Sequence, residues 1–97
     1  MNYTKESGSE DDHDIILYSL STCPRCNETK KFLKEKGHSY RYINVDETSR
    51  KEKREITMFL RRHNLTIAFP VLVIDEKIIQ GFKPTEIKKL LELSQIT

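Results

Sequence analysis

The sequence predicts a single α/β domain in which a mixed sheet of four strands is flanked by helices. Short apolar runs typical of strands alternate along the chain with segments of helical spacing, in the order β-α-β-α-β-β-α. The first two strands are joined through a helix and should run parallel, whereas the last two are joined by a tight turn and should run antiparallel. The length of 97 residues is enough for one domain and too short for two.

The first half of the chain predicts a strand, a helix and a second strand. Residues Ile15–Tyr18 form an apolar, partly β-branched run, which is typical of a strand buried on both faces. Pro24 suits a first helical position and Gly37 is a stop signal, so the pattern predicts a helix over residues 24–36. The apolar residues within Ser39–Val45 predict the second strand.

The second half predicts a helix, a hairpin and a last helix. Residues 50–63 place apolar side chains at the i, i+3 and i+4 spacing of a helix, and the preceding Asp46, Thr48 and Ser49 offer candidate N-caps. The remaining expected elements are strands over Val71–Ile74 and Ile78–Gln80, joined by a tight connection at residues 75–77, and a helix over residues 84–94.

Residues 1–14 are expected to form a disordered acidic tail. They carry one lysine against five acidic residues and lack periodic apolar side chains, so they bury too little surface to offset the entropy of ordering. Because the whole chain has a formal charge of +2 and the tail has −4, the domain over residues 15–97 carries +6. A basic body favours acidic partners. Since acids are interleaved with the bases and no nucleic-acid motif is present, we expect no nucleic-acid partner.

The chain shows no feature of a membrane or secreted protein. No apolar segment approaches the roughly 20 residues that a membrane-spanning helix needs, and residues 1–14 lack the apolar region of a secretory signal. We therefore expect a cytoplasmic protein that does not engage a membrane. Two cysteines, Cys23 and Cys26, are too few for the disulfide network of a small secreted protein, which indicates that they serve chemistry.

Cys23 and Cys26 form a Cys-Pro-Arg-Cys motif at the expected start of the first helix. Cysteines three residues apart lie on one side of a helical turn, so their sulfurs can reach disulfide distance. Free N–H groups and the helix dipole favour the thiolate form of Cys23. Pro24 lacks an N–H that would be unpaired there in any case, and Arg25 adds positive charge.

This position predicts the role of each cysteine. Cys23, on the exposed side, should attack a substrate disulfide, and Cys26, one turn further in, should resolve the mixed disulfide. The redox group is then the dithiol itself, with no separate cofactor and no metal.

Two other interpretations of the motif are an inert cysteine pair, either a disulfide or two buried thiols, and a metal site. A structural zinc site needs four ligands, and none of His13, His38 and His63 pairs with another at zinc-finger spacing. We expect His38 and His63 to be solvated loop or helix-end residues. A metal-binding or iron–sulfur module that uses Cys23 and Cys26 is the alternative from outside the enzyme class.

Three segments resemble one known family. Tyr18–Cys26 (YSLSTCPRC) resembles the active-site segment of glutaredoxins, which have the thioredoxin fold. Ala68–Val71 (AFPV) resembles the cis-proline loop of that family, and Gln80–Pro84 (QGFKP) resembles the Gly-Phe-Arg-Pro segment of NrdH-redoxins. The likeness covers about residues 15–93 and, with the motifs in the right order, it is strong.

The resemblance implies a small monomeric dithiol–disulfide oxidoreductase. It implies that the Phe69–Pro70 bond is cis, that Pro70 packs against the cysteines, and that the backbone of Phe69 pairs with an extended substrate. Gly81 and Phe82 are the other residues that we expect to contact substrate.

Departures from glutathione-using glutaredoxins concern the electron donor. Leu20 stands where those proteins usually place a lysine for a glutathione carboxylate, Arg25 replaces a tyrosine, and Gln80 and Lys83 fall where a Gly-Gly-Asp pattern is usual. NrdH-redoxins share this loss and are reduced by a thioredoxin reductase. We therefore expect a thioredoxin-reductase-type flavoprotein as donor, with glutathione as the alternative.

Two further expectations concern partners. The substrates should be protein disulfides, and a ribonucleotide reductase is a candidate by analogy alone. Residues 50–62 contain six basic and two acidic side chains, which could form a docking face for an acidic reductase. A solvated helix face is the simpler interpretation of that segment.

Overall fold

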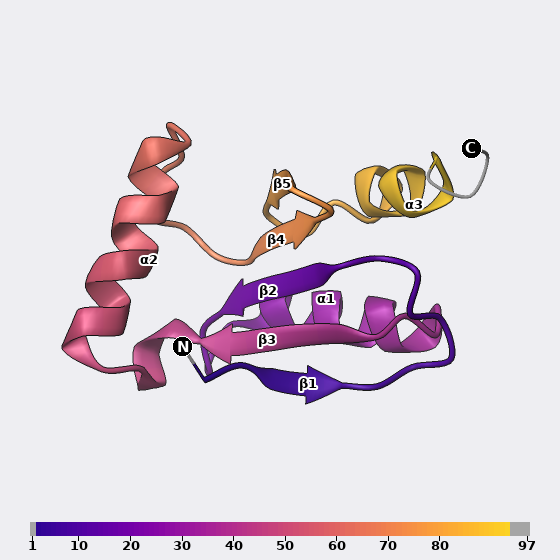
Figure 1. The fold of residues 1–97 in the computed structure, drawn as a ribbon, viewed down its shortest axis with the longest axis horizontal. Coiled ribbons are helices and arrows are strands. Elements are labelled where there is room, and N and C mark those ends of the chain that lie inside the picture. The colour runs from indigo at the N-terminus through magenta and orange to yellow at the C-terminus, as the bar shows by residue number, and fades with distance from the viewer. Residues whose placement is uncertain (1, 94–97) are drawn as a thin grey trace.

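The computed structural model describes residues 2–93, with side chains for residues 2–92, and shows one sheet with helices packed on both faces (Figure 1). The expected helix end at Ser94 lies outside the described residues. In chain order the elements are β1 (Thr4–Glu6), β2 (Ile15–Ser19), α1 (Pro24–Glu35), β3 (Tyr40–Asn44), the 3-10 turn η1 (Val45–Glu47), α2 (Arg50–Arg62), β4 (Val71–Ile74), β5 (Lys77–Gln80) and α3 (Pro84–Leu93).

The sheet is mixed, as the sequence predicts, and has the strand order β1-β3-β2-β4-β5. β2 runs parallel to β3, with Leu17 opposite Tyr42, and antiparallel to β4, with Leu17 opposite Leu72. β4 and β5 form the expected hairpin. Its turn residues Asp75 and Glu76 have φ of 47° and 76°, the positive values that match a two-residue turn to the twist of the strands. The predicted β-α-β-α-β-β-α order is therefore confirmed from β2 to α3.

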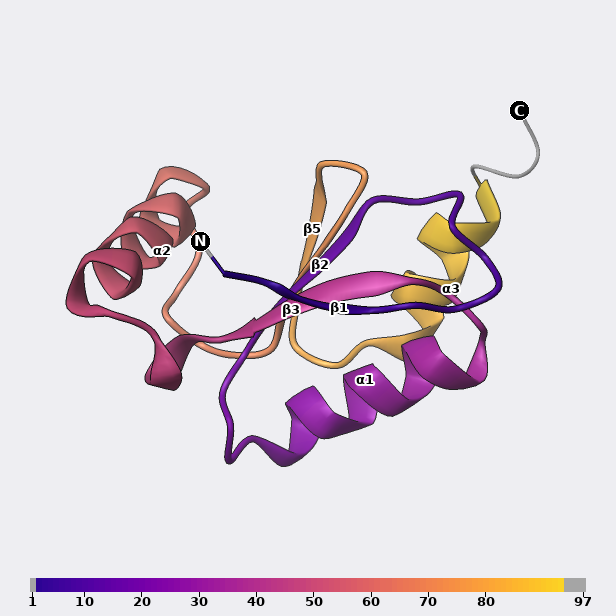
Figure 2. The same ribbon diagram turned by 60° about the horizontal axis from the view of Figure 1, so that its bottom comes forward.

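Alternate side chains of β2 serve two cores, one on each face of the sheet. Ile15 and Leu17 pack in the core that receives Leu33 of α1 and Ile87 of α3. Tyr18 packs in the other core, which α2 covers. Figure 2 shows α1 and α2 on opposite sides of the strands. Burial on both faces explains why this strand is a continuous apolar run rather than an alternating one.

The prediction of a disordered tail over residues 1–14 is wrong for the part that the structure describes. β1 lies antiparallel along the edge of β3, with Thr4 opposite Tyr42 (Figure 1). Further on, the N–H of Glu10 donates to the carbonyl of Gly37 at 2.8 Å. The segment is polar, but its backbone groups pair with the open edge of β3. Amino-acid composition does not reveal backbone pairing of this kind. Within residues 2–93 the sheet therefore has five strands rather than four.

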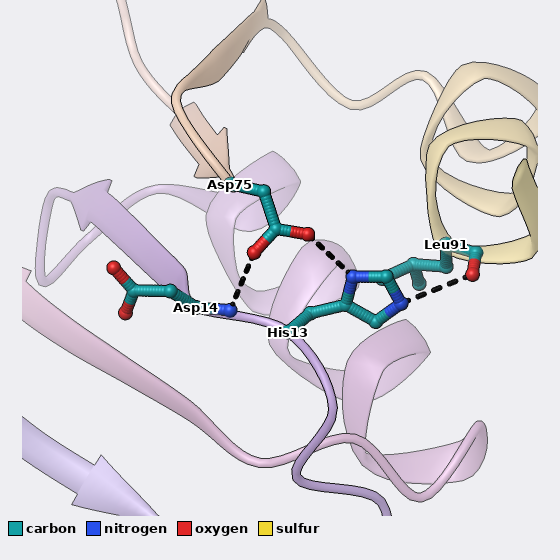
Figure 3. A network of polar contacts seen from close by, with 4 residues as sticks. All are labelled: His13, Asp14, Asp75 and Leu91. Atoms are coloured by element: carbon teal, nitrogen blue, oxygen red, sulfur yellow. Dashed lines mark hydrogen bonds and ion pairs between the residues drawn. The ribbon is translucent and has the colours of Figure 1, made fainter. Parts of the chain in front are cut away.

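A buried histidine ties this N-terminal arm to the rest of the domain (Figure 3). His13 is 7% exposed, and its Nδ1 lies 2.6 Å from the carboxylate of Asp75, while its Nε2 lies 3.1 Å from the carbonyl oxygen of Leu91. The N–H of Asp14 donates to the same Asp75 carboxylate at 2.8 Å. A carbonyl oxygen only accepts, so Nε2 of His13 donates to Leu91. One side chain thus joins the arm, the β4–β5 turn and α3.

His38 is a second correction, because it is buried rather than solvated. It is 9% exposed, and its ring centroid lies 5.9 Å from that of His13. Burial, together with the neighbouring His13, holds the pKa of His38 below its usual value. By contrast, His63 is exposed at the C-cap of α2, as expected for a helix-end residue.

The contact between Asp75 and His13 predicts a stability that depends on pH. The hydrogen bond from His13 lowers the pKa of Asp75, so its contribution is complete above the unfolded pKa of about 3.9 and is lost as pH falls through the lower folded value. We expect Asp75→Asn to reduce the free energy of unfolding at pH 5 by about 1 kcal/mol, since the carboxyl is partly exposed. Below about pH 3 the difference from wild type should shrink.

Urea denaturation followed by circular dichroism measures both quantities. Asp11→Asn, an exposed acidic position on the same arm, is the matched control and should leave the pH profile unchanged. An Asp75→Asn variant as stable as wild type at pH 5 would show that the arm does not depend on this contact.

Candidate active site

Cys23 is the N-cap of α1, so its side chain lies at the free end of the helix backbone. Its Sγ accepts a hydrogen bond from the N–H of Cys26 at 3.2 Å, and Pro24 occupies the first helical position. Cys23 is partly exposed and, like Cys26, is a free thiol. An N–H aimed at the sulfur and the positive end of the helix dipole both stabilise negative charge at this atom.

Cys26 occupies the opposite environment. Its exposed fraction is 0%, because it lies on the side of α1 that faces the interior. Burial, with a further contribution from the hydrogen bond with Cys23, raises the pKa of Cys26 to about 12. The two sulfurs therefore differ at neutral pH. Cys23 Sγ is accessible and accepts a hydrogen bond from a backbone N–H, whereas Cys26 is a buried, protonated thiol.

The loop between β2 and Cys23 is held against the end of β3 and the turn that follows it. The hydroxyl of Ser19 donates to the Asn44 side chain at 2.6 Å. The N–H of Ser21 donates to the Asp46 carboxylate at 2.9 Å, and the Ser21 hydroxyl binds the second carboxylate oxygen. These bonds lower the pKa of Asp46. The N–H of Cys23 closes a turn onto the carbonyl of Leu20 at 3.2 Å.

The role of Asp46 cannot be predicted from the local sequence, which indicates only a candidate helix cap at this position. The cap of α2 is instead Ser49, which forms a capping box with Glu52. The pairing of β2 with β3 explains why Asp46 lies beside the cysteine loop. Ser19 lies opposite Asn44 in the parallel pair, so two residues further on Ser21 comes beside Asp46.

Pro70 and Gly81 lie at the same end of the sheet as the cysteine loop. The Phe69–Pro70 peptide bond is cis, as the resemblance implies, and Pro70 is fully buried. Tyr18 pairs with Val71, so Pro70 comes next to the end of β2. The N–H of Gly81 donates to the carbonyl of Pro70 at 2.8 Å, and the φ of 93° at Gly81 is one that glycine adopts without strain. The register thus brings Pro70 and Gly81 to the end of the sheet where the cysteine loop lies.

The other expected site residues differ in how firmly they are packed. The ring of Phe82 is half-buried and packs edge-on against Phe32 of α1, with centroids 6.1 Å apart. The Arg25 side chain is 70% exposed and lies 3.9 Å from Glu28, so solvent screens its charge. Phe69 and Leu20 are half-buried and pack against the core under α2.

Residues 2–93 contain neither a cluster of potential metal ligands nor a membrane-spanning helix. No three His, Cys, Asp or Glu side chains are grouped there as potential metal ligands. No helix in that range is long and apolar enough to cross a membrane.

The raised pKa of Cys26 gives a direct prediction. In a Cys23→Ser variant, the remaining Cys26 thiol should stay protonated up to about pH 10 in the native state, because burial disfavours the thiolate. The Cβ chemical shift of isotopically labelled cysteine reports its ionisation. The same protein unfolded in guanidinium is the control and should titrate near pH 8.5. Native titration near that value would contradict the assigned environment of Cys26.

Comparison with known proteins places this geometry in a family. The glutaredoxin family model matches residues 15–79. A glutaredoxin-like 8.6 kDa protein from the rubredoxin operon of Clostridium pasteurianum is 38% identical, over 80% of this chain and 97% of that protein.

Solved structures show the same fold. A glutaredoxin from Methanosarcina mazei superposes with a TM-score of 0.80 at 41% identity, covering 90% of this chain and 84% of that one. NrdH-redoxin from Escherichia coli superposes with a TM-score of 0.66 at 27% identity, covering 79% of this chain and 93% of that one. Both have the thioredoxin-like fold of glutaredoxins. This chain therefore belongs to the glutaredoxin family, whose members are thiol–disulfide oxidoreductases.

Proposed function

We propose that this protein is a dithiol electron carrier that reduces protein disulfides, with Cys23 as the nucleophile and Cys26 as the resolving thiol. The asymmetry between the two sulfurs is the observation that carries the proposal. Cys23 is partly exposed and accepts the Cys26 N–H at 3.2 Å, whereas Cys26 is fully buried with a raised pKa. Only the exposed sulfur can meet a disulfide on another molecule.

The reaction follows from thiol–disulfide exchange. The Cys23 thiolate attacks one sulfur of the substrate disulfide, the substrate S–S bond breaks, and the other substrate sulfur leaves as a thiolate that takes a proton from water. Cys26 then gives its proton to water as its sulfur attacks Cys23 Sγ. The Cys23–Cys26 disulfide forms, and the second substrate sulfur leaves as a thiolate. Two electrons have passed to the substrate, and a donor must return them to the protein.

A thioredoxin-reductase-type flavoprotein is the donor that we propose. Leu20, at the place of the glutathione-binding lysine, packs half-buried in the core under α2 and offers no charge for a carboxylate. Arg25 is solvent-screened. The NrdH-redoxin of Escherichia coli, which resembles this chain, is described as having a thioredoxin-like activity profile.

Glutathione is the second candidate donor, because a similar structure at 41% identity is a glutaredoxin. Under either donor, the dithiol is the redox group and one chain supplies both of its sulfurs, so the proposed carrier works as a monomer. A dithiol carrier that reduces disulfides needs a reducing compartment, so we propose a cytoplasmic location. Among protein substrates, a ribonucleotide reductase is the candidate to test first.

The two candidate electron donors are distinguished by measuring NADPH consumption with hydroxyethyl disulfide as the electron acceptor. One reaction contains thioredoxin reductase, and the other contains glutathione with glutathione reductase. We expect turnover to be at least about tenfold faster with thioredoxin reductase, since losing a charged partner for a carboxylate costs about 1–3 kcal/mol of glutathione binding.

The control for this assay is Cys23→Ser, which should be inactive with both donors. Faster turnover with glutathione would overturn the proposed donor while leaving the dithiol mechanism intact. Metal bound stoichiometrically through the cysteines, with no dithiol cycling, would overturn the proposed function itself.

A further inference from the structure

We infer that Gln80 is a positioning residue that makes this protein selective for disulfides within polypeptides. Its side-chain amide holds the loop of residues 66–70, which would present the backbone of Phe69 to substrate. This inference rests on the proposed function, because it concerns how a protein disulfide is held beside Cys23.

Gln80 makes three hydrogen bonds to one loop. It is the last residue of β5, opposite Val71 in the hairpin. Its Nε2 donates to the carbonyl of Thr66 at 2.7 Å and to the carbonyl of Ala68 at 3.1 Å. Its Oε1 accepts from the Thr66 hydroxyl at 3.3 Å. Because carbonyls only accept, the orientation of the amide is fixed, and both of its N–H bonds are engaged.

The Gln80 side chain supplies hydrogen bonds beyond the point where the β4–β5 backbone ladder ends. The ladder between β4 and β5 ends at the pair Val71–Gln80, and Pro70 has no N–H with which to extend it. The N–H of Gly81 binds the carbonyl of Pro70 at 2.8 Å. The carbonyls of alternate residues 66, 68 and 70 are therefore all tied to the end of β5, two of them by one side chain.

The centre of this loop has little packing to hold it. Ile67 is 54% exposed and Ala68 is also exposed, so packing contributes little at the centre of the loop. Phe69 is half-buried, which anchors its ring but leaves the preceding backbone dependent on hydrogen bonds. Segments with few buried contacts open at low cost. Loss of the Gln80 amide should therefore loosen the loop without unfolding the domain.

A fixed loop over residues 66–70 should matter more for binding of protein disulfides than for binding of small disulfides. A disulfide in a polypeptide can lay its extended backbone along Phe69, in the manner of a strand added to a sheet edge, and this pairing requires the loop to be in place. A small disulfide without a peptide backbone needs only access to Cys23 Sγ. Gln80 should therefore act on the affinity for protein disulfides and leave the chemistry of the sulfurs unchanged.

The test uses pre-reduced protein in single-turnover reactions, so that no electron donor is involved. Oxidation by excess insulin or by hydroxyethyl disulfide is quenched with acid, and the remaining thiols are counted by alkylation and mass measurement. We expect Gln80→Met, which keeps the length but removes the hydrogen bonds, to raise the half-saturating insulin concentration about 5- to 10-fold. The limiting rate with insulin and the rate with hydroxyethyl disulfide should stay within about twofold of wild type.

Two further variants make the result specific. Lys77→Met places the same side chain at the exposed start of β5 and should behave as wild type. Gln80→Glu keeps the shape but supplies a carboxylate that repels the carbonyls of residues 66 and 68. It should show the same shift with insulin, and it provides the test if Gln80→Met does not fold.

Three outcomes would overturn the inference. Equal losses with insulin and hydroxyethyl disulfide in a Gln80 variant would mean that Gln80 supports the cysteines rather than the loop. Unchanged kinetics in both Gln80 variants would mean that the amide has no role in substrate binding. Wild-type protein that reduces hydroxyethyl disulfide but not insulin would overturn the proposed function together with this inference, a pattern that no variant is needed to recognise.

Discussion

The pairing of β2 on both sides is the constraint on which the rest of the structure depends. β2 is parallel to β3 and antiparallel to β4, with Ser19 opposite Asn44 and Tyr18 opposite Val71. These two registers bring the start of α1, the turn after β3 and Pro70 to one end of the sheet. A shift of either register by one residue would exchange the two faces of β2 and separate these parts of the site.

At that end, backbone geometry rather than a charged side chain distinguishes the two cysteines. Arg25, the basic residue between the two cysteines in the chain, is exposed and lies 3.9 Å from Glu28, so its field is weak. The N–H of Cys26 points at Cys23 Sγ, and burial keeps the Cys26 thiol protonated. Both effects come from the start of α1 and from the face that this helix turns inward. The start of α1 thus gives Cys23 and Cys26 different chemical environments.

Much of the fold and of the site could be predicted from local patterns. The apolar run at Ile15–Tyr18, Pro24 at the helix start and the hairpin signals each depend on neighbours in the chain, and the structure confirms the elements that they predict. The N-terminal arm could not be predicted in this way. It is ordered by contacts with distant residues, such as His13 with Asp75, and composition describes only what a segment can bury alone.

The parts of the site that the sequence missed depend in the same way on register. Asp46 reads as a helix cap until the parallel pair places it beside Ser21. Gln80 reads as a strand end until the hairpin brings its amide to the carbonyls of residues 66 and 68. Neither contact leaves a local pattern, whereas the cysteine motif does.

The unequal roles of the two cysteines are the central claim, and covalent trapping tests them most directly. Reduced Cys26→Ser protein is mixed with insulin and analysed by mass measurement under non-reducing conditions. The account predicts a mixed disulfide that accumulates through Cys23, because no resolving thiol is left to release it. The matched Cys23→Ser variant, whose only thiol is buried, should trap none. Equal or faster trapping through Cys26 in the Cys23→Ser variant would contradict the assignment.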